Sequence, residues 1–536
     1  MNLKLSIVVA FTFVLCCPQA YSQTQEGTQT TNHANTQKDT DTQVKKQRDN
    51  RKLKQNRKQD TDSGIQEHRK EITESLYGTY KTYQETSLDK RRFKYHELQP
   101  LIDAYRVNPK FKVQTVGKSI EGRKLSLISI GSGKTNVFLW SQMHGDEPTA
   151  TQAIFDILNF FDSEDFEEEK QDILKSCTLH FLPMLNPDGA EVYQRRNRLG
   201  IDINRDALRL QSPESQTLKS VRDSLDADFG FNLHDQSTYY NAERTEKPAT
   251  ISYLAPAYNY EKEINDVRAD AMKVIVFMNG VIQKYAPGQV GRYNDDFEPR
   301  AFGDNIQKWG TSAILIESGG YSEDVEKQEI RKLNYVSILS AIYTIAKGNY
   351  KDIALDEYEK IPENDRKLFD LKIEKANYPL LGNNYRIDIG MNRLEVDEED
   401  HASFWYSSRV IDQGDLSTYY GYENLDASGY TIVPGKVYPE TLKSVDVLGK
   451  LKIESLLKSG HTYIRIENIP KKMLSSPFPI HIIGKNYEVP EFNIDVGVNP
   501  TFLLEKNGKI EYAVINGFLI DVNQSATKFG NAMIYR

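Results

Sequence analysis

Two short clusters of polar residues carry the side chains of a potential metal site. In His144-Gly145-Asp146-Glu147-Pro148, an imidazole and a carboxylate stand three residues apart in an expected turn, where both could converge on one cation. His234 directly follows Phe231-Asn232-Leu233 and could supply a third ligand. Two histidines and one carboxylate leave one position of a tetrahedral zinc ion open for water, as in catalytic zinc sites. A single His-x-x-Glu pair is common by chance, and His234 could instead be a histidine hydrogen-bonded at the rim of a sheet.

Two further clusters carry side chains suited to the hydrolysis of a peptide bond. The stretch 186–206 contains four arginines among turn-forming residues. Arginine is well suited to holding a terminal carboxylate and to stabilising an oxyanion, although such a stretch could also be a solvated loop. Glu317 ends the apolar run Ile314-Leu315-Ile316, where burial would raise the pKa of its carboxyl toward that of a useful base. The alternative roles of this glutamate are capping a helix and pairing with a lysine.

In this order, the clusters resemble those of the zinc carboxypeptidases of the M14 family, over about residues 76–348. The resemblance implies one zinc ion per chain, held by His144, Glu147 and His234. It also implies that Asp202 orients the first zinc histidine. That role makes physical sense, because a carboxylate on the outer ring nitrogen fixes the orientation of a metal-binding imidazole.

The same resemblance implies how a peptide would be held and cleaved. Arg195 is similar to the arginine that polarises the scissile carbonyl. Asn204 and Arg205 match the pair that grips the terminal carboxylate of the substrate. Glu317 matches the general base, which takes a proton from the attacking water and passes it to the leaving amine.

Two residues match the family by position alone. Tyr293 stands where the family has a mobile tyrosine that covers bound substrate. Asp304 lies near the position that selects the terminal residue of the substrate. There it would favour a basic residue or serve as a structural acid.

The activity implied by the resemblance is that of a metallocarboxypeptidase acting on peptide or protein C termini. Within the same chemistry, an amidase that trims cell-wall (murein) peptides is the second hypothesis, and a related deacylase is the third. The Asn204-Arg205 pair and the long C-terminal half favour peptides over the deacylase. A catalytically inactive module that recognises peptide ends is the hypothesis from another class, and the intact set of metal-binding residues argues against it.

The chain around these clusters predicts an α/β domain over residues 76–348. Apolar runs predict strands at 125–130, 136–140, 178–183, 228–233 and 312–316. Helical spacing predicts one helix with Pro148 at its first position, one that opens at Ser212-Pro213, and one from about Asp324 to Gly348. We therefore expect a mixed central sheet flanked by helices, with the four clusters at or near the ends of its strands, where open α/β sheets bind ligands.

The rest of the chain is expected to form a separate, β-rich region. Residues 349–375 are charged and typical of a linker, and short alternating runs across 376–536 predict strands. Asn507-Gly508 and Asn516-Gly517 predict tight hairpin turns. No motif in this region indicates a role for it.

The N-terminus is typical of an exported protein. An apolar run from Leu5 to Cys17 precedes Ala20-Tyr21-Ser22, so residues 1–22 are predicted to be a signal peptide cleaved after Ser22. A lipoprotein anchored at Cys16 or Cys17 is the alternative, and it fits poorly because the residue before each cysteine is not small. Residues 23–75 are mostly polar, with almost nothing to bury, and predict a disordered linker. We expect a periplasmic or extracellular protein.

Composition excludes several classes of function. The 536 residues include 68 Lys and Arg against 76 Asp and Glu, and the net charge of −8 argues against a nucleic-acid binder. Three cysteines are too few for a disulfide scaffold or a cysteine-rich zinc finger. After removal of the signal peptide, no apolar run is suited to spanning a membrane.

Overall fold

The structure, a computed structural model, describes residues 72–524 and 529–536, and these described residues belong to one compact unit. The predicted signal peptide and residues 23–71 of the predicted linker lie outside the described residues. Residues 72–75 were also assigned to that linker, which is wrong. They begin a helix over 72–83, and Ile72 and Thr73 are buried because they pack on the first domain.

A mixed eight-stranded sheet forms the centre of the first domain, which confirms the predicted fold class. Its middle strands β4, β3, β5 and β9 are parallel neighbours, whereas β1, β2 and β7 join antiparallel to the strand beside them. In spatial order the strands are β1 (Lys112–Lys118), β2 (Lys124–Gly131), β4 (Cys177–Leu182), β3 (Thr135–Ser141), β5 (Phe229–Asp235), β9 (Ser312–Ser318), β7 (Ile251–Leu254) and β8 (Val290–Arg292).

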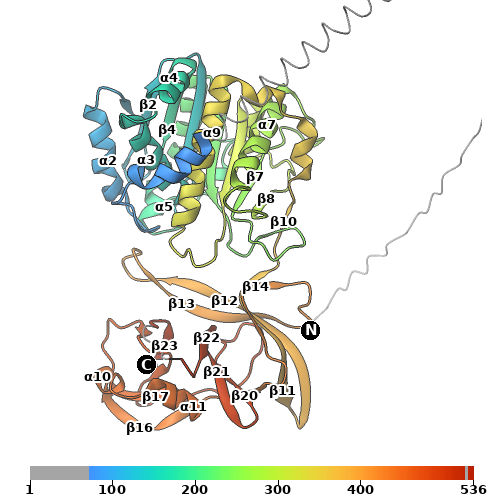
Figure 1. Cartoon of the computed structure of the whole chain (residues 1–536). Coiled ribbons are helices and arrows are strands. Elements are labelled where there is room, and N and C mark those ends of the chain that lie inside the picture. The colour runs from blue at the N-terminus through green and yellow to red at the C-terminus, as the bar shows by residue number, and fades with distance from the viewer. Residues whose placement is uncertain (1–71, 525–528) are drawn as a thin grey trace, which may run out of the picture. The chain divides into compact units, whose positions relative to one another are not determined.

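Helices cover both faces of this sheet (Figure 1). Successive side chains of a strand point to opposite faces, so in β3 Val137 and Leu139 enter one core while Phe138 and Trp140 enter the other. The larger core lies under α2 (Tyr95–Val107), α3 (Thr149–Asp162), α4 (Glu167–Ser176), α7 (Asp266–Ile282) and α9 (Gln328–Lys347). The smaller core lies under α6 (Pro213–Leu225) and α8 (Phe302–Lys308).

The predicted linker 349–375 is wrong, because this segment belongs to folded structure. It contains the short helices η2 (Asn349–Asp352) and η3 (Leu355–Lys360), and the strand β10 (Asn364–Asp365) pairs with β6 (Asn241–Ala242). Tyr358 is fully buried, and its hydroxyl oxygen accepts a hydrogen bond from the Ala255 amide at 2.9 Å. The charged residues suggested a solvated segment, while Tyr350 and Tyr358 among them pack into the larger core.

The β-rich region confirms the predicted strand content and both predicted hairpins. Asn507-Gly508 joins β20 to β21 and Asn516-Gly517 joins β21 to β22, with positive φ at all four residues. One sheet contains β11 (Leu368–Leu380), β12 (Asn383–Asp397), β13 (Phe404–Gly414), β14 (Tyr420–Asp426), β15 (Thr431–Val433), β20 (Phe502–Lys506), β21 (Lys509–Ile515) and β22 (Phe518–Asp521). The second contains β16 (Lys436–Ser444), β17 (His461–Asn468), β18 (Ser475–Ser476), β19 (His481–Ile483) and β23 (Ala532–Tyr535). Within 72–524 and 529–536, none of the helices has the length and apolar character needed to cross a membrane.

Candidate active site

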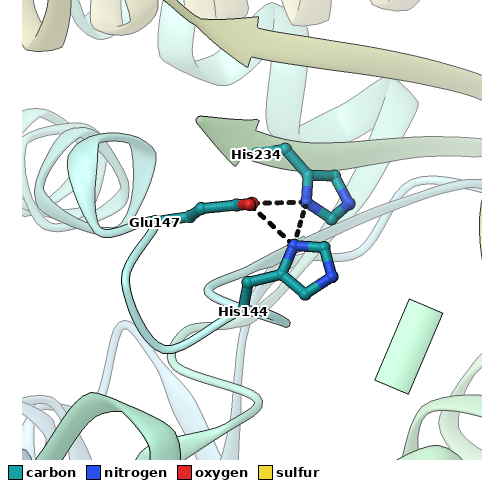
Figure 2. Close-up of side chains that lie close together, drawn as sticks. All are labelled: His144, Glu147 and His234. Carbon is teal, nitrogen blue, oxygen red and sulfur yellow. Dashed lines mark hydrogen bonds and ion pairs between the residues drawn. The ribbon is translucent and has the colours of Figure 1, made fainter. Parts of the chain in front are cut away.

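Three side chains predicted to bind metal converge in the structure (Figure 2). His144 and Glu147 lie in the turn between β3 and α3, and His234 lies near the end of β5, which is the parallel neighbour of β3. His144 Nδ1 is 2.8 Å from Glu147 Oε1, and His234 Nδ1 is 2.6 Å from Glu147 Oε2. The two Nδ1 atoms are 3.2 Å apart. Strand pairing therefore brings together residues that are 90 positions apart in the chain.

The donor set of this cluster fits a zinc ion. All three side chains are buried, and their ligand atoms lie within 4.8 Å of one another. Two imidazole nitrogens and a carboxylate are the ligand types of catalytic zinc, and such a set leaves a coordination position for water. Two ring nitrogens that face each other so closely are best satisfied by a shared cation.

Asp202, which the resemblance implies orients the first zinc histidine, contacts His144 in the structure. Its Oδ1 lies 3.1 Å from His144 Nε2, and its Oδ2 accepts a hydrogen bond from Arg195 Nε at 3.0 Å. A hydrogen on Nε2 leaves the lone pair of Nδ1 directed at the cluster, which is the tautomer that a metal requires. Asp202 thus links a metal-binding histidine to the arginine expected at the scissile carbonyl.

Charges in the cluster shift the pKa values of its members. Burial disfavours the imidazolium of His144, but the carboxylates of Glu147 and Asp202 outweigh it and raise the pKa of this ring to about 9. For Glu147, burial is outweighed by the two histidines, which hold the pKa of its carboxyl well below the usual range. Burial lowers the pKa of His234 despite its contact with Glu147. The shifts of His144 and Glu147 thus show a strong attraction between the carboxylate and the first histidine at the centre of the site.

Glu317 lies beside the cluster because β9 is the next strand after β5. Its Cα is paired in register with that of His234. Burial, and then the negative charge of Glu147, raise the pKa of the Glu317 carboxyl well above its ordinary value. A carboxylate with a raised pKa accepts a proton from water more readily, which is what a general base requires.

Arg195 lies at the rim of the cluster with its side chain 43% exposed. Its Nη1 is 3.3 Å from Glu147 Oε1, and its Nη2 is 3.0 Å from Asp202 Oδ2. Each nitrogen of the guanidinium therefore contacts a carboxylate, while the side chain remains partly accessible. A cationic side chain that solvent can reach at this rim could stabilise negative charge on a bound carbonyl oxygen.

The structure places Asn204 and Arg205 on a short helix, η1 (Ile203–Arg205), directly after Asp202. Asn204 Oδ1 accepts a hydrogen bond from the Phe302 amide at 2.9 Å, which fixes η1 to α8. The Arg205 side chain is 37% exposed, and its Nε is 3.6 Å from Glu298 Oε2.

Asp304 lies in α8, near the group formed by Arg205 and Glu298. Its Oδ1 accepts a hydrogen bond from the Glu298 amide at 3.0 Å, and burial raises the pKa of its carboxyl to about 7. One oxygen of this side chain is therefore used to hold the backbone at Glu298. Its position beside Arg205 also keeps it close to the expected location of the substrate carboxylate.

Tyr293 lies beside the expected base. It directly follows β8, and its ring contacts that of Tyr240 with the centroids 5.7 Å apart. Burial raises the pKa of Tyr293, and the nearby charge of Glu317 raises it further. The structure thus brings the three metal-binding residues, Asp202, Arg195, Glu317 and Tyr293 into one region, with η1 adjacent.

Sequence reasoning missed Asp235 and Lys327, which lie next to the cluster on the side of Glu147. The amide of Asp235 donates to Glu147 Oε2 at 3.2 Å, and the Asp235 carboxylate forms a buried ion pair with Lys327 Nζ at 3.0 Å. Asp235 follows His234 directly, so its position was a usable signal. Lys327 is 92 residues further along the chain, and no local pattern marks it.

Comparison with known proteins agrees with this geometry. The family model described as "Zinc carboxypeptidase" (Peptidase M14) matches residues 101–279. Carboxypeptidase SOL1 of Arabidopsis thaliana is 27% identical over 179 residues, covering 28% of this chain and 36% of that protein. Carboxypeptidase E of Caenorhabditis elegans is 30% identical over 112 residues, covering 17% of this chain and 24% of that protein.

The chain thus spans about a third or less of the length of these relatives. A solved metallo-carboxypeptidase from Burkholderia cenocepacia is 16% identical, with a TM-score of 0.39, and the match covers 48% of this chain and 70% of that one. The family match includes His144, Glu147, Arg195 and His234. Residues 101–279, within the first domain, are thus similar to the zinc carboxypeptidases of the M14 family.

Proposed function

We propose that this chain is an exported, zinc-dependent metallocarboxypeptidase that hydrolyses the C-terminal peptide bond of peptides. The observation that carries the proposal is the convergence of His144, Glu147 and His234, with Glu317 in register on the next strand. Export is supported by the signal-peptide pattern of the first 22 residues. One zinc ion per chain is the expected stoichiometry, because the structure offers one such ligand group among the described residues.

Each side chain of the site has a task in this reaction. A zinc ion held by the three ligands would lower the pKa of its water and polarise the substrate carbonyl. Glu317 takes the proton of that water and delivers it to the leaving amine. Arg195 stabilises the negative charge that develops on the carbonyl oxygen. Asn204 and Arg205 hold the terminal carboxylate, which makes the enzyme an exopeptidase.

The test is zinc content together with amino-acid release by the purified mature chain. We expect about one zinc per chain, the stoichiometry of a single catalytic site, and stepwise release of C-terminal residues from a mixed peptide library. In the matched variant Glu317→Gln, zinc should be retained while release falls by at least about 100-fold, because the base is lost and the ligands are intact. Release of amino acids at the wild-type rate in this variant would show that Glu317 is not the general base.

The same measurement separates the other hypotheses. Zinc without release from linear peptides would direct attention to cell-wall peptides or to a deacylase. A chain that binds no zinc would be an inactive binding module. The convergence of every ligand in a buried cluster favours the hydrolase.

A further inference from the structure

The loop that follows β5, the strand of His234, is hydrogen-bonded to the β-rich region. Residues 236–241 leave β5 two positions after His234. Tyr239 donates a hydrogen bond from its hydroxyl to Asp370 Oδ2 at 2.8 Å, and its carbonyl accepts one from the Leu368 amide at 3.3 Å. Both partners lie at the start of β11. The first strand of the β-rich region, β11, therefore contacts this loop through one side-chain and one backbone hydrogen bond.

One tyrosine of the β-rich region lies against the segments that follow the strands of His234 and Glu317. The hydroxyl of Tyr422, in β14, donates to the Thr238 carbonyl at 2.5 Å. The same hydroxyl lies over Gly320, three residues after Glu317. A Cβ at Gly320 would be 2.0 Å from Tyr422 Oη and 2.9 Å from the Thr238 carbonyl oxygen. Only glycine leaves room for this contact without a shift in the neighbouring chain.

The Gly320 carbonyl also accepts a hydrogen bond from Thr250 Oγ1 at 2.8 Å. Thr238, Gly320 and Tyr422 line a cavity of about 560 Å³, so the two segments face open space there rather than packed side chains. The hydrogen bond from Tyr422 to the Thr238 carbonyl therefore contributes more to the local stability of this backbone than it would in a packed core.

The same loop also contacts Tyr293, the residue expected to cover bound substrate. Tyr240, in residues 236–241, contacts the ring of Tyr293. The backbone of the loop is joined to β9, because the Gln236 amide donates to the Ser318 carbonyl at 2.9 Å. A displacement of residues 236–241 would thus be transmitted to Tyr293 and to the strand that carries Glu317.

We infer that Tyr422 is a positioning residue for the active site, and that the β-rich region is an integral part of the catalytic unit. By holding Thr238 and Gly320 together, it fixes the relative position of the strand ends that carry His234 and Glu317. The catalytic consequence rests on the proposed function. The positioning itself can be measured without any assay of activity.

The experiment compares Tyr422→Phe with the matched control Tyr430→Phe in the full chain. Tyr430 also donates a hydroxyl hydrogen bond at 2.5 Å, to Glu511, but both residues lie within the β-rich region. Hydrogen exchange is followed at the amides of Gln236 and Gly319, which bond to the Ser318 and Thr250 carbonyls. Zinc content, thermal unfolding, kcat and KM are measured in parallel.

In Tyr422→Phe we expect exchange at the two reporter amides to quicken by about threefold to tenfold, the range for losing one hydrogen bond, while Tyr430→Phe leaves it unchanged. We expect kcat to fall by at least about threefold, with KM changed by less than about twofold and zinc retained, because misplaced groups slow chemistry more than binding. Gly320→Ala should act in the same direction, because its methyl group displaces the Tyr422 hydroxyl.

Unchanged exchange at both reporter amides in Tyr422→Phe would overturn the inference, whatever the activity. Faster exchange with unchanged kcat would overturn the catalytic part of it. A wild-type chain that binds zinc but releases no amino acid would refute the proposed function instead, and the exchange data would still decide whether Tyr422 holds the two segments.

Discussion

Asp202 gives the most direct test of how the site is organised. Its carboxylate accepts hydrogen bonds from Arg195 Nε and from the Asn204 amide, each at 3.0 Å, and faces His144 Nε2 at 3.1 Å. Asp202→Asn preserves the shape of the side chain and removes its charge. The amide has a single acceptor oxygen for these three donors, and its own NH₂ group would face N–H groups.

The magnitude of this change follows from the contacts that are lost. A hydrogen bond to a charged group contributes about 1.5–3 kcal/mol, and the His144 contact is of this kind. Loss of a carboxylate that orients a metal ligand typically weakens metal binding by about 10- to 100-fold. We expect the zinc affinity to fall by about 10- to 100-fold. We also expect kcat to fall, because Arg195 Nε loses its hydrogen bond to the carboxylate.

Zinc affinity is measured by competition with a chelator, with Asp188→Asn as the control. Asp188 is a buried carboxylate of the same stretch, but it accepts hydrogen bonds from Ser119 and Arg123. A zinc affinity of Asp202→Asn within about twofold of the wild type would refute the reasoning, because it would show that the contact does not orient His144. An equal loss in Asp188→Asn would point to general destabilisation.

Three further predictions concern single residues. His144→Ala should abolish both zinc binding and activity, and stoichiometric zinc in this variant would contradict the ligand assignment. Burial raises the pKa of the Cys177 thiol to about 12, so iodoacetamide should label the unfolded mature chain but not the native one at about pH 8; native labelling would show that the thiol is reached. The pKa of Asp304 is raised to about 7, so its carboxyl becomes anionic as the pH rises through that value. If it selects the terminal residue, release of lysine relative to leucine should increase from about pH 6 to 8, and this increase should vanish in Asp304→Asn; a ratio that does not change with pH would leave Asp304 only its structural task.

Local signals in the sequence were sufficient for much of the fold. The apolar runs of β3, β5 and β9 predicted strands because a strand buried on both faces needs apolar side chains at successive positions. The Asn-Gly pairs predicted their hairpins because these residues tolerate positive φ. The segment 349–375 was misassigned because its charged composition is a local average, whereas the burial of Tyr358 depends on the surface that the rest of the domain presents.

The identities of the chemical groups were present in the sequence, but their relative positions were not. His144-Gly145-Asp146-Glu147 shows its two ligands within one turn, and the family resemblance supplied the role of Glu317. Only the tertiary structure paired Asp235 with Lys327 beside Glu147, and only it joined Tyr422 to Thr238, 184 residues away. The physical reason is that a turn or a strand is determined by neighbouring residues, whereas such a contact exists only after the chain has closed long loops around a common core.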